Sequence, residues 1–557
     1  MKVLILGGYG VFGGRLAGLL ADEPRVTLII AGRHLARAEA FCRSLPGDAQ
    51  REPLEFDRSA DLHKQLQPVQ PDIVIDASGP FQAYGRDPYR LIRACVDLKI
   101  NYMDLADGSS FVQSVANFDA EALDAGIFVL SGVSSFPVLT AAVVRALTAD
   151  WHRVRRISAG IAPSPYAGVG LNVIRAIAAY AGKPVQIVRK GRVAMAPALI
   201  DAQRHTIAPP GRLPLHNIRF TLVDVPDLRV LPELWPDLDE LWVGAGPVPA
   251  LLHRLLSLLS WLVRLRLLRS LVWLAPLFHL VINNLRWGEH RGGMFVDVAG
   301  ENRQGGAVRR SWHLLAEGDD GPLIPSMAAE ALVRRCLDGR TPEPGARSGA
   351  RALELRDYEW LFHKRTIVSG CREQEPAAAP LYQRVLGDAW LELPAAVRDL
   401  HDVSVKRRFS GLVDVERGTS RLAALIAARL SLPPAGQAQP LSVEFEPHAG
   451  QETWSRRFGQ HLFSSRQWAG QGRSEYLLCE RIGPLVFHMA LVLTNGRLNL
   501  VQRRWFCCGL PMPLALAPDG EVYEYEEGGR FHFHVEIRQR LIGLVVRYRG
   551  WLKADVS

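Results

Sequence analysis

The chain has 557 residues, of which 48% are hydrophobic and 22% charged, with a formal net charge of +9 and a pI near 9.3. This length predicts about three domains or two large ones, each with enough apolar residues for a core. The arginines are scattered, and we find no helix-turn-helix, zinc-finger or RNP signature, so we expect no nucleic-acid partner. The basic balance suits an anionic cofactor or an anionic membrane surface instead.

The cysteines give no sign of a metal or disulfide framework. They are an odd, unpatterned set of seven, at positions 42, 95, 336, 371, 479, 507 and 508. We expect reduced thiols in a cytoplasmic protein and no metal site. No basic segment with a cleavage site precedes the first apolar run, so we expect no secretory signal.

The first fourteen residues, MKVLILGGYGVFGG, have the order strand, glycine turn, helix. An apolar run over 3–6 predicts a buried strand, Gly8-x-Gly10-x-x-Gly13 follows, and residues 15–21 favour a helix. This is the context in which such a motif binds a dinucleotide pyrophosphate at a helix N-terminus. An ordinary tight turn is the alternative. The residues predicted to contact the cofactor here are Gly7, Gly8, Tyr9, Gly10, Val11, Phe12 and Gly13.

The second predicted strand, residues 26–31, indicates which dinucleotide is bound. No Asp or Glu lies between Val26 and Arg37 to hold a ribose 2′-hydroxyl, whereas Arg33 follows the strand at the offset of a 2′-phosphate ligand. The pattern therefore favours NADP over NAD. A solvated charge at a helix start is the other interpretation of Arg33.

Two further runs extend the predicted sheet. Residues 54–57 predict a third strand that ends at Asp57, near the expected adenine, and 73–77 a fourth that ends in a Ser78-Gly79-Pro80 turn. A turn at the carboxyl end of a parallel strand faces the cofactor. Strands and helices alternating at this spacing predict a doubly wound parallel sheet of the α/β class.

These segments resemble the saccharopine dehydrogenase-like reductases over about residues 1–145. The motifs that carry the resemblance are Gly7-Gly8-Tyr9-Gly10-Val11-Phe12-Gly13, Ala31-Gly32-Arg33, Ala77-Ser78-Gly79-Pro80-Phe81, Ala94-Cys95 and Asn101-Tyr102-Met103-Asp104-Leu105. The resemblance implies a Rossmann NAD(P)-binding domain, then an α+β domain over 146–375 that supplies the substrate site and often a homodimer contact. It also implies a return to the first domain at about 323–340. The motifs specify a cofactor fold and not a substrate.

The second domain has fewer signals. Residues 294–300 and 309–316 predict two paired strands. Proline-dense residues 209–236 predict a surface excursion with solvated Asp224, Asp227 and Asp237, and 341–350, TPEPGARSGA, have a linker composition.

Residues 250–284 are unusually rich in leucine. One helical stripe holds Leu252, Leu256, Leu259, Val263 and Leu267, with arginines off it. The longest uncharged stretch is too short to span a bilayer. The segment could lie at the inner face of a membrane as a peripheral contact, or form a buried helix pair or dimer contact. Each alternative requires an apolar partner, which is lipid, a subunit or a long-chain substrate.

The last module, 380–557, is predicted to be a β-rich antiparallel meander or barrel because long strand-like runs alternate with Gly, Asn-Gly and Asp-Gly turns. His532 and His534 share one strand face without a further ligand residue at metal spacing. Motifs such as Trp454-x-Arg456-Arg457-Phe458 and Tyr548-Arg549-Gly550-Trp551-Leu552 resemble a bacterial domain family of unknown function that is fused behind such reductases. That resemblance implies no activity.

The candidate catalytic groups lie in and after the predicted strand that contains Tyr102. Tyr102 and Asp104 are the candidate acids, with Asp107 beside them, and turn capping is an equal alternative for all three. We expect an NAD(P)-dependent oxidoreductase that acts on an apolar or lipid-like small molecule, with the C-terminal domain binding a ligand. The alternative is a membrane-associated scaffold that senses the nucleotide without turnover.

Overall fold

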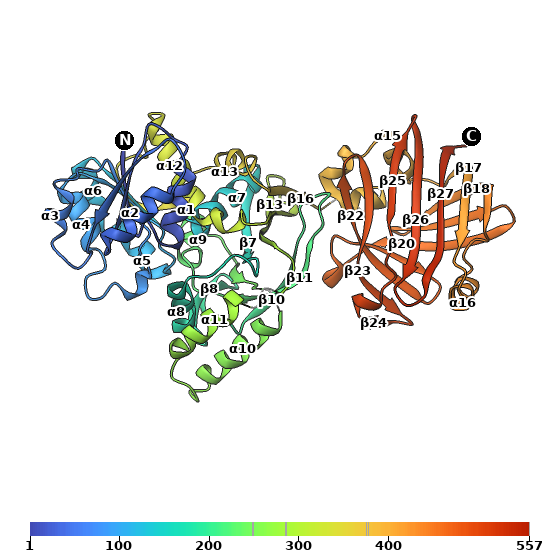
Figure 1. Ribbon diagram of the computed structural model, residues 1–557, viewed down its shortest axis with the longest axis horizontal. Helices are drawn as coiled ribbons and strands as arrows, with labels where there is room; N and C mark the ends of the chain where they lie inside the picture. The colour runs from blue at the N-terminus through green and yellow to red at the C-terminus, as the bar shows by residue number, and fades with distance from the viewer. Residues whose placement is uncertain (248–249, 285–286, 375, 377, 556–557) are drawn as a thin grey trace. The chain divides into compact units, whose positions relative to one another are not determined.

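The computed structural model describes residues 1–247, 250–284, 287–374, 376 and 378–555. The chain divides into two compact units, residues 1–203 with 218–369, and residues 204–217 with 370–557 (Figure 1). Its three sheets are parallel, mixed and antiparallel, so the expected fold class is confirmed.

The first sheet is a seven-stranded parallel sheet in the order β15-β6-β5-β4-β1-β2-β3. Its central strands β1 and β4 are apolar runs buried on both faces, as expected of a sheet covered by helices. The strands are β1 (Lys2–Leu6), β2 (Thr27–Gly32), β3 (Gln50–Glu55), β4 (Ile73–Asp76), β5 (Asn101–Asp104), β6 (Phe128–Ser131) and β15 (Gly345–Ser348). The main helices are α1 (Val11–Leu20), α2 (Leu35–Ser44), α4 (Arg90–Asp97), α5 (Ser109–Ser114), α6 (Asp119–Ala125) and α12 (Ile324–Leu337).

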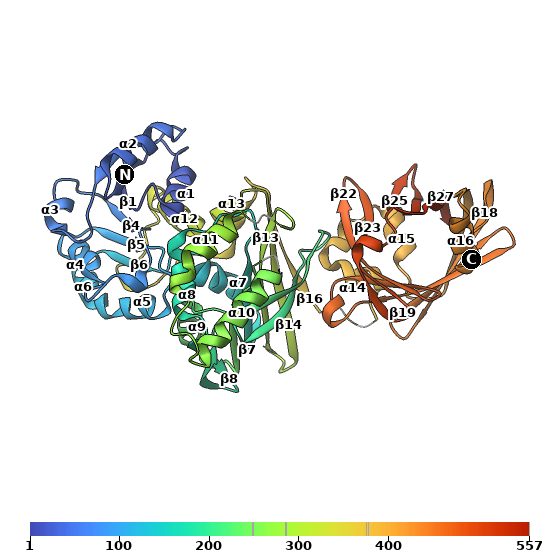
Figure 2. The ribbon, with the colours of Figure 1, turned by 60° about the horizontal axis from the view of Figure 1, so that its bottom comes forward.

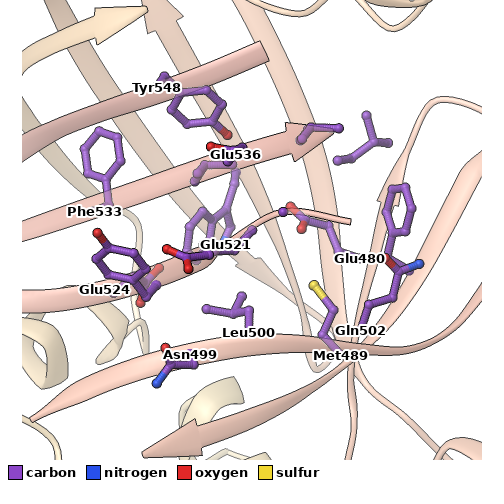
Figure 3. Close-up of a pocket in the computed structure, with 18 of the residues that line it drawn as sticks. Glu480, Met489, Asn499, Leu500, Gln502, Glu521, Glu524, Phe533, Glu536 and Tyr548 are labelled. Atoms are coloured by element: carbon purple, nitrogen blue, oxygen red, sulfur yellow. The ribbon is translucent and has the colours of Figure 1, made fainter. Parts of the chain in front are cut away.

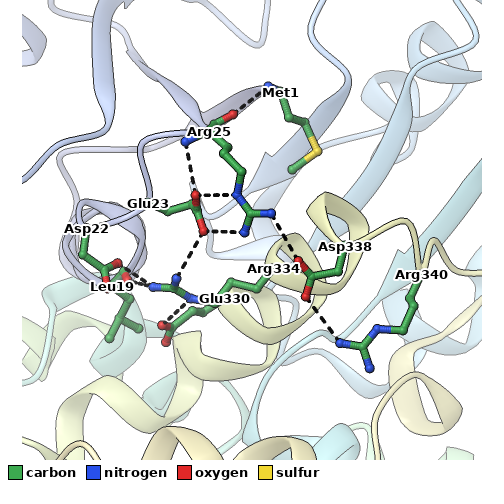
Figure 4. A network of polar contacts seen from close by, with 9 residues as sticks. All are labelled: Met1, Leu19, Asp22, Glu23, Arg25, Glu330, Arg334, Asp338 and Arg340. Carbon is green, nitrogen blue, oxygen red and sulfur yellow. Dashed lines mark hydrogen bonds and ion pairs between the residues drawn. The ribbon is translucent and has the colours of Figure 1, made fainter.

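Helix α12 lies within the segment predicted to return to this domain, and it packs on α1. Arg334 of α12 donates to the Leu19 carbonyl at 2.9 Å and pairs with Asp22 at 2.5 Å and with the buried Glu330 at 3.1 Å (Figure 4). The Arg25 guanidinium holds the pKa of Glu23 at about 2. These contacts bind the returning helix to the first domain.

The linker predicted at 341–350 is wrong, because this segment contains β15, which pairs in parallel with β6. Asp119 accepts a hydrogen bond from the Ala346 N–H at 2.8 Å. The strand is only four residues long, GARS, without a β-branched residue, so its local composition matches a linker. Pairing with β6 determines its conformation.

The second sheet is mixed and has nine strands in the order β10-β11-β12-β7-β13-β14-β16, with β8 paired to β12 and β9 to β8. The strands are β7 (Trp151–Ala162), β8 (Pro184–Arg189), β9 (Arg192–Pro197), β10 (Ala202–Ile207), β11 (Leu215–Leu222), β12 (Glu240–Ala245), β13 (Arg291–Asn302), β14 (Ala307–Glu317) and β16 (Ile367–Glu373). The helices around it are α7 (Thr140–Leu147), α8 (Leu171–Tyr180), α9 (Asp227–Leu234), α10 (Ala250–Arg264), α11 (Ala275–Asn284) and α13 (Leu355–Phe362). The hairpin predicted from residues 294–316 is confirmed as β13 and β14.

The surface excursion predicted at 209–236 is also wrong. The segment forms β11 and α9, and Leu228, Leu231 and Asp227 are buried. Burial raises the pKa of Asp227 to about 7, so this carboxyl is not solvated. The prolines lie at turns and in a short helix, where their fixed φ is tolerated.

The third sheet is a closed antiparallel barrel in the second unit. Its order is β22-β21-β20-β19-β18-β17-β27-β26-β25-β23, and the pairing of β22 with β23 closes the ring, while β24 extends from β23 (Figure 2). The strands are β17 (Arg407–Arg417), β18 (Gly436–His448), β19 (Gln451–Phe458), β20 (His461–Ala469), β21 (Leu478–Ile482), β22 (Leu485–Thr494), β23 (Arg497–Cys507), β24 (Leu510–Met512), β25 (Val522–Glu527), β26 (Arg530–Gln539) and β27 (Gly543–Ala554). The short helices α14 (Leu381–Leu386) and α15 (Ala395–His401) pack against it, and α16 (Arg421–Arg429) contacts β27.

Candidate functional site

The glycine turn after β1 is shaped to approach a phosphate closely. The N–H groups of Gly7 and Gly8 donate to the Ala31 carbonyl at 2.9 and 3.1 Å, which binds the turn to the end of β2. A Cβ on Gly13 would lie 2.3 Å from the Gly7 oxygen, so only glycine lets α1 pack this closely. The first N–H groups of α1, beginning at Val11, have no partner within the helix and carry its positive dipole end. The turn and helix start thus fit a pyrophosphate.

The end of β2 carries the arginine that the sequence predicts as the ligand of an NADP 2′-phosphate. Tyr9 lies over Gly32, where a Cβ would meet its ring at 2.5 Å, and the His34 N–H donates to the Tyr9 hydroxyl at 3.2 Å. Arg33 and Arg37 are exposed, and within the described part of the chain neither forms an ion pair. Both guanidinium groups are therefore available to an anion at this position.

The turn after β4 contains a polar cluster that the sequence did not reveal. Asp76 is fully buried and accepts a hydrogen bond from the Ser78 hydroxyl at 2.5 Å and one from Tyr84 at 3.1 Å. Arg58 lies 3.5 Å from the same carboxylate and stacks over the Tyr84 ring. Burial raises the pKa of Tyr84, which stays protonated. The cluster fixes the conformation of Ser78 and, through it, of the predicted Ser78-Gly79-Pro80 turn.

Asp57, predicted near the adenine, lies at the start of the loop after β3. Its carboxylate accepts the Ser59 N–H at 2.9 Å, and its carbonyl accepts the Gln65 amide at the same distance. The side chain is exposed. Its contacts are those of a turn-capping residue, and a role in cofactor binding stays a prediction.

The candidate acids Tyr102 and Asp104 lie in the interior, which corrects the expectation that they face the substrate. Both are 0% exposed. Asp104 accepts hydrogen bonds from the Gly132 N–H, the Ser131 hydroxyl and the Ala106 N–H at 2.8 to 3.0 Å, and burial raises its pKa to about 7. Burial also raises the pKa of Tyr102 well above its usual value. Asp104 thus binds the turns after β5 and β6, whereas the Tyr102 hydroxyl makes no hydrogen bond within the described residues. With no exposed surface, neither side chain lies open to a substrate.

A different tyrosine lies where these strands end. Helix α8 begins near the β4 turn, where Asn172 donates to the Gly79 carbonyl at 3.5 Å, and it ends at Tyr180. Tyr180 is half-buried, and its hydroxyl forms no hydrogen bond with any residue that the structure describes. The charges of Asp107 and Asp224 both act on it, and with burial as the larger cause they raise its pKa, which keeps the phenol protonated. No periodicity in the sequence marks Tyr180, because Asp107 and Asp224 come from two other segments.

The barrel encloses a cavity of about 610 Å³ (Figure 3). Aromatic and aliphatic side chains such as Phe533, Met489 and Leu500 form much of its wall. Three of the acidic groups on the wall have basic partners. Glu480 pairs with Arg456 at 3.5 Å, Glu524 with His401 at 2.6 Å and Glu536 with Arg547 at 2.8 Å.

Among the described residues that line this cavity, Gln502 has a buried side-chain atom without a partner. The Nε2 atom of Gln502 is buried and makes no hydrogen bond with the described residues, so it can donate to a ligand. Tyr382 and Leu400, from α14 and α15, also line the cavity. A cavity with apolar walls and a buried free donor suits an apolar ligand that carries an acceptor.

The two histidines predicted to share a strand face, His532 and His534, do not line the cavity. Phe531, Phe533 and Val535 line the cavity, so the alternating His532 and His534 point away from it. His534 stacks on Tyr523 with centroids 4.9 Å apart. Within the described residues no group of three or more His, Cys, Asp or Glu side chains is arranged to hold a metal.

Two protein families match parts of the chain. Residues 3–130 match the saccharopine dehydrogenase NADP binding domain, and residues 393–552 match a domain of unknown function, DUF4166. No curated protein matches the chain significantly.

Solved structures resemble it at low identity. Apo saccharopine dehydrogenase (L-Glu forming) from Saccharomyces cerevisiae is 13% identical and covers 67% of this chain and 99% of its own, with a TM-score of 0.48. A mutant meso-DAP dehydrogenase from Clostridium tetani with DAP is 14% identical, covering 64% and 95%, with a TM-score of 0.32. The WlbA dehydrogenase from Thermus thermophilus with NAD and alpha-ketoglutarate is 11% identical, covering 62% and 90%, with a TM-score of 0.29. All three scores are below 0.5, too low for the substrates of these enzymes to bear on this chain.

Proposed function

We propose that this chain, an NAD(P)-dependent oxidoreductase whose first domain belongs to the saccharopine dehydrogenase NADP binding family, prefers NADPH and acts on an apolar, lipid-like substrate. The observation that carries the cofactor assignment is the glycine turn, where Gly13 packs so closely on Gly7 that no side chain fits. Val11, Phe12 and Gly13 would hold the pyrophosphate through their N–H groups. Arg33, with Arg37 close by, would hold the 2′-phosphate. When bound, the cofactor supplies or accepts a hydride.

Tyr180 is the proton donor in this proposal. Its hydroxyl has no hydrogen-bond partner within the described residues, and a phenol is protonated at neutral pH, so it carries a proton that it can donate to a substrate oxygen or carbon. Gln82 donates to Asp107 at 3.0 Å and thereby orients one of the two carboxylates beside it. Asp224 is the second carboxylate and restores the phenol after turnover by relaying a proton from solvent.

The apolar substrate is supported by the composition of α8. Between Asn172 and Tyr180 this helix carries one charged side chain, Arg175, and otherwise presents Val173, Ile177 and Ala179 in half-buried positions. A dicarboxylate substrate requires several convergent cations, and these residues do not supply them.

The test is loss of NADPH absorbance with long-chain carbonyl and enoyl compounds, compared with short polar ones. Tyr180→Phe should lower kcat about 10²- to 10⁴-fold while NADPH binding stays unchanged. Tyr89→Phe is the matched control, since Tyr89 lies in the same compact unit, donates to the Phe111 carbonyl and should retain activity. Equal turnover by Tyr180→Phe and the wild type would remove the proton-donor role.

The barrel is the second part of the proposal, as a binding site for an apolar ligand. A fluorescent fatty acid should bind to the full chain, and Gln502→Leu should weaken an acceptor-bearing ligand more than a plain hydrocarbon probe. The scaffold alternative, in which the nucleotide is sensed without turnover, requires NADPH binding with no substrate-dependent oxidation across the whole panel.

A further inference from the structure

The leucine-rich insert exposes its apolar side chains and buries its polar ones. On α10 the residues Leu251, Leu255, Leu258 and Trp261, followed by Leu265 just beyond its end, recur at helical spacing along one face, and all are 45% exposed or more. Trp273, in the turn between the helices, is 68% exposed. The stripe predicted from the sequence, Leu252, Leu256, Leu259 and Val263, is only half-buried, and its last member, Leu267, is exposed.

The buried face of α10 is polar and anchored. His253 forms a hydrogen bond of 2.8 Å with Thr221, and Arg219 donates to Ser257 at 2.8 Å. The Ser260 carbonyl lies 2.3 Å from the position of a Cβ on Gly182, so the helix backbone sits directly on that glycine. These contacts fix which face points outward. The orientation is the reverse of a helix packed by its leucines on a core.

The charges around this face have one sign. Arg254, Arg264, Arg266 and Arg269 are exposed, and in the described chain none of them forms an ion pair. Between Glu240 and Glu289 the sequence contains no acidic residue. A second copy of the face would bring like charges together, whereas an anionic bilayer offers acyl chains for the leucines and phosphates for the arginines.

We propose that α10 and α11 form a docking surface for anionic membranes. The helices lie along the interface, since among the described residues no helix is long and apolar enough to cross a bilayer. On α11, Leu277 and Leu280 are also more than half exposed and extend the apolar face. Both helices project from the same side of the first unit (Figures 1 and 2).

The docking surface is connected to the residues of the proposed substrate site. Asn283 of α11 hydrogen-bonds both the N–H and the carbonyl of Val169, at 3.0 and 3.1 Å. Val169 directly precedes α8, which carries Asn172 and Tyr180. The bilayer would therefore supply the apolar substrate next to α8. This second step rests on the proposed function, whereas membrane binding itself does not.

The experiment is flotation of the full chain with vesicles of phosphatidylcholine alone and of phosphatidylcholine with phosphatidylglycerol. The wild type should float with the anionic vesicles. Leu251→Gln, Leu255→Gln and Leu258→Gln together should reduce bound protein at least tenfold, and Arg254→Gln with Arg264→Gln should remove the preference for anionic lipid. The matched control is Leu422→Gln with Leu425→Gln on α16, two leucines of similar exposure, which should float like the wild type.

The outcomes separate this proposal from the proposed function. NADPH binding should be the same in the leucine variant and the wild type, which shows that the variant is folded and that the cofactor site is independent of docking. Equal flotation of the leucine variant and the wild type overturns the proposal. A second result also overturns it: the wild type is a dimer in solution and does not float, and the leucine variant is a monomer. The face is then a subunit contact. If the protein binds membranes but oxidises no NADPH with any substrate, the membrane-docking proposal holds and the proposed reductase activity is refuted.

Discussion

Replacing Gly13 by alanine tests the cofactor site directly. The added Cβ would lie 2.3 Å from the Gly7 oxygen and 2.8 Å from the Gly7 carbonyl carbon, both well inside ordinary contact. The turn has to move away from α1, at a cost of about 1–3 kcal/mol in the free energy of unfolding. Losing one charge-assisted hydrogen bond to the pyrophosphate costs about 1.5–3 kcal/mol, which raises the Kd for NADPH about 10- to 100-fold.

Gly18→Ala is the matched control on the same helix. Nothing lies within 4 Å of a Cβ at Gly18, so alanine should stabilise α1 by about 0.5–1 kcal/mol and leave NADPH binding unchanged. NADPH binding is measured by the quenching of protein fluorescence, and stability by urea unfolding. If Gly13→Ala binds NADPH as tightly as Gly18→Ala, the turn does not hold the phosphate and the cofactor assignment fails.

The remaining predictions concern the first unit. Arg33→Asp should abolish the preference for NADPH over NADH, measured as the ratio of the two Kd values, and an unchanged ratio would exclude Arg33 as the 2′-phosphate ligand. Because burial raises the pKa of Asp104 to about 7, the folded chain holds this proton more tightly than the unfolded chain. This difference makes the free energy of unfolding fall as the pH rises from about 4 to about 7. Asp104→Asn should flatten that dependence, measured by urea unfolding at several pH values. An unaltered dependence would contradict the raised pKa of Asp104. Arg334→Ala leaves the buried carboxylate of Glu330 without its partner and should cost about 3–5 kcal/mol of unfolding free energy. A loss below about 1 kcal/mol would mean that α12 is held by apolar packing alone.

The sequence by itself determined the elements whose signal is local. The β1 run, the glycines at 7, 8, 10 and 13 and the helix after them are contiguous, and a Cβ on Gly10 or Gly13 would meet Gly7 within the same turn. The same holds for the hairpin of β13 and β14 and for the succession of strands in the barrel, where turn residues and alternation are read within a few positions.

Only the tertiary structure decided the features that depend on distant segments. β15 is a strand because β6 offers it a parallel edge, although its own composition is that of a linker. Tyr102 and Asp104 are enclosed because neighbouring strands and their turns cover them. The pKa of Tyr180 is raised by burial and by the charges of Asp107 and Asp224, which come from other segments. On α10 the leucine periodicity was visible in the sequence, but which face is buried was not. Hydrogen bonds from Thr221 and Arg219 fix that orientation. Such bonds join residues far apart in the sequence, so the residue spacing within either segment does not predict them.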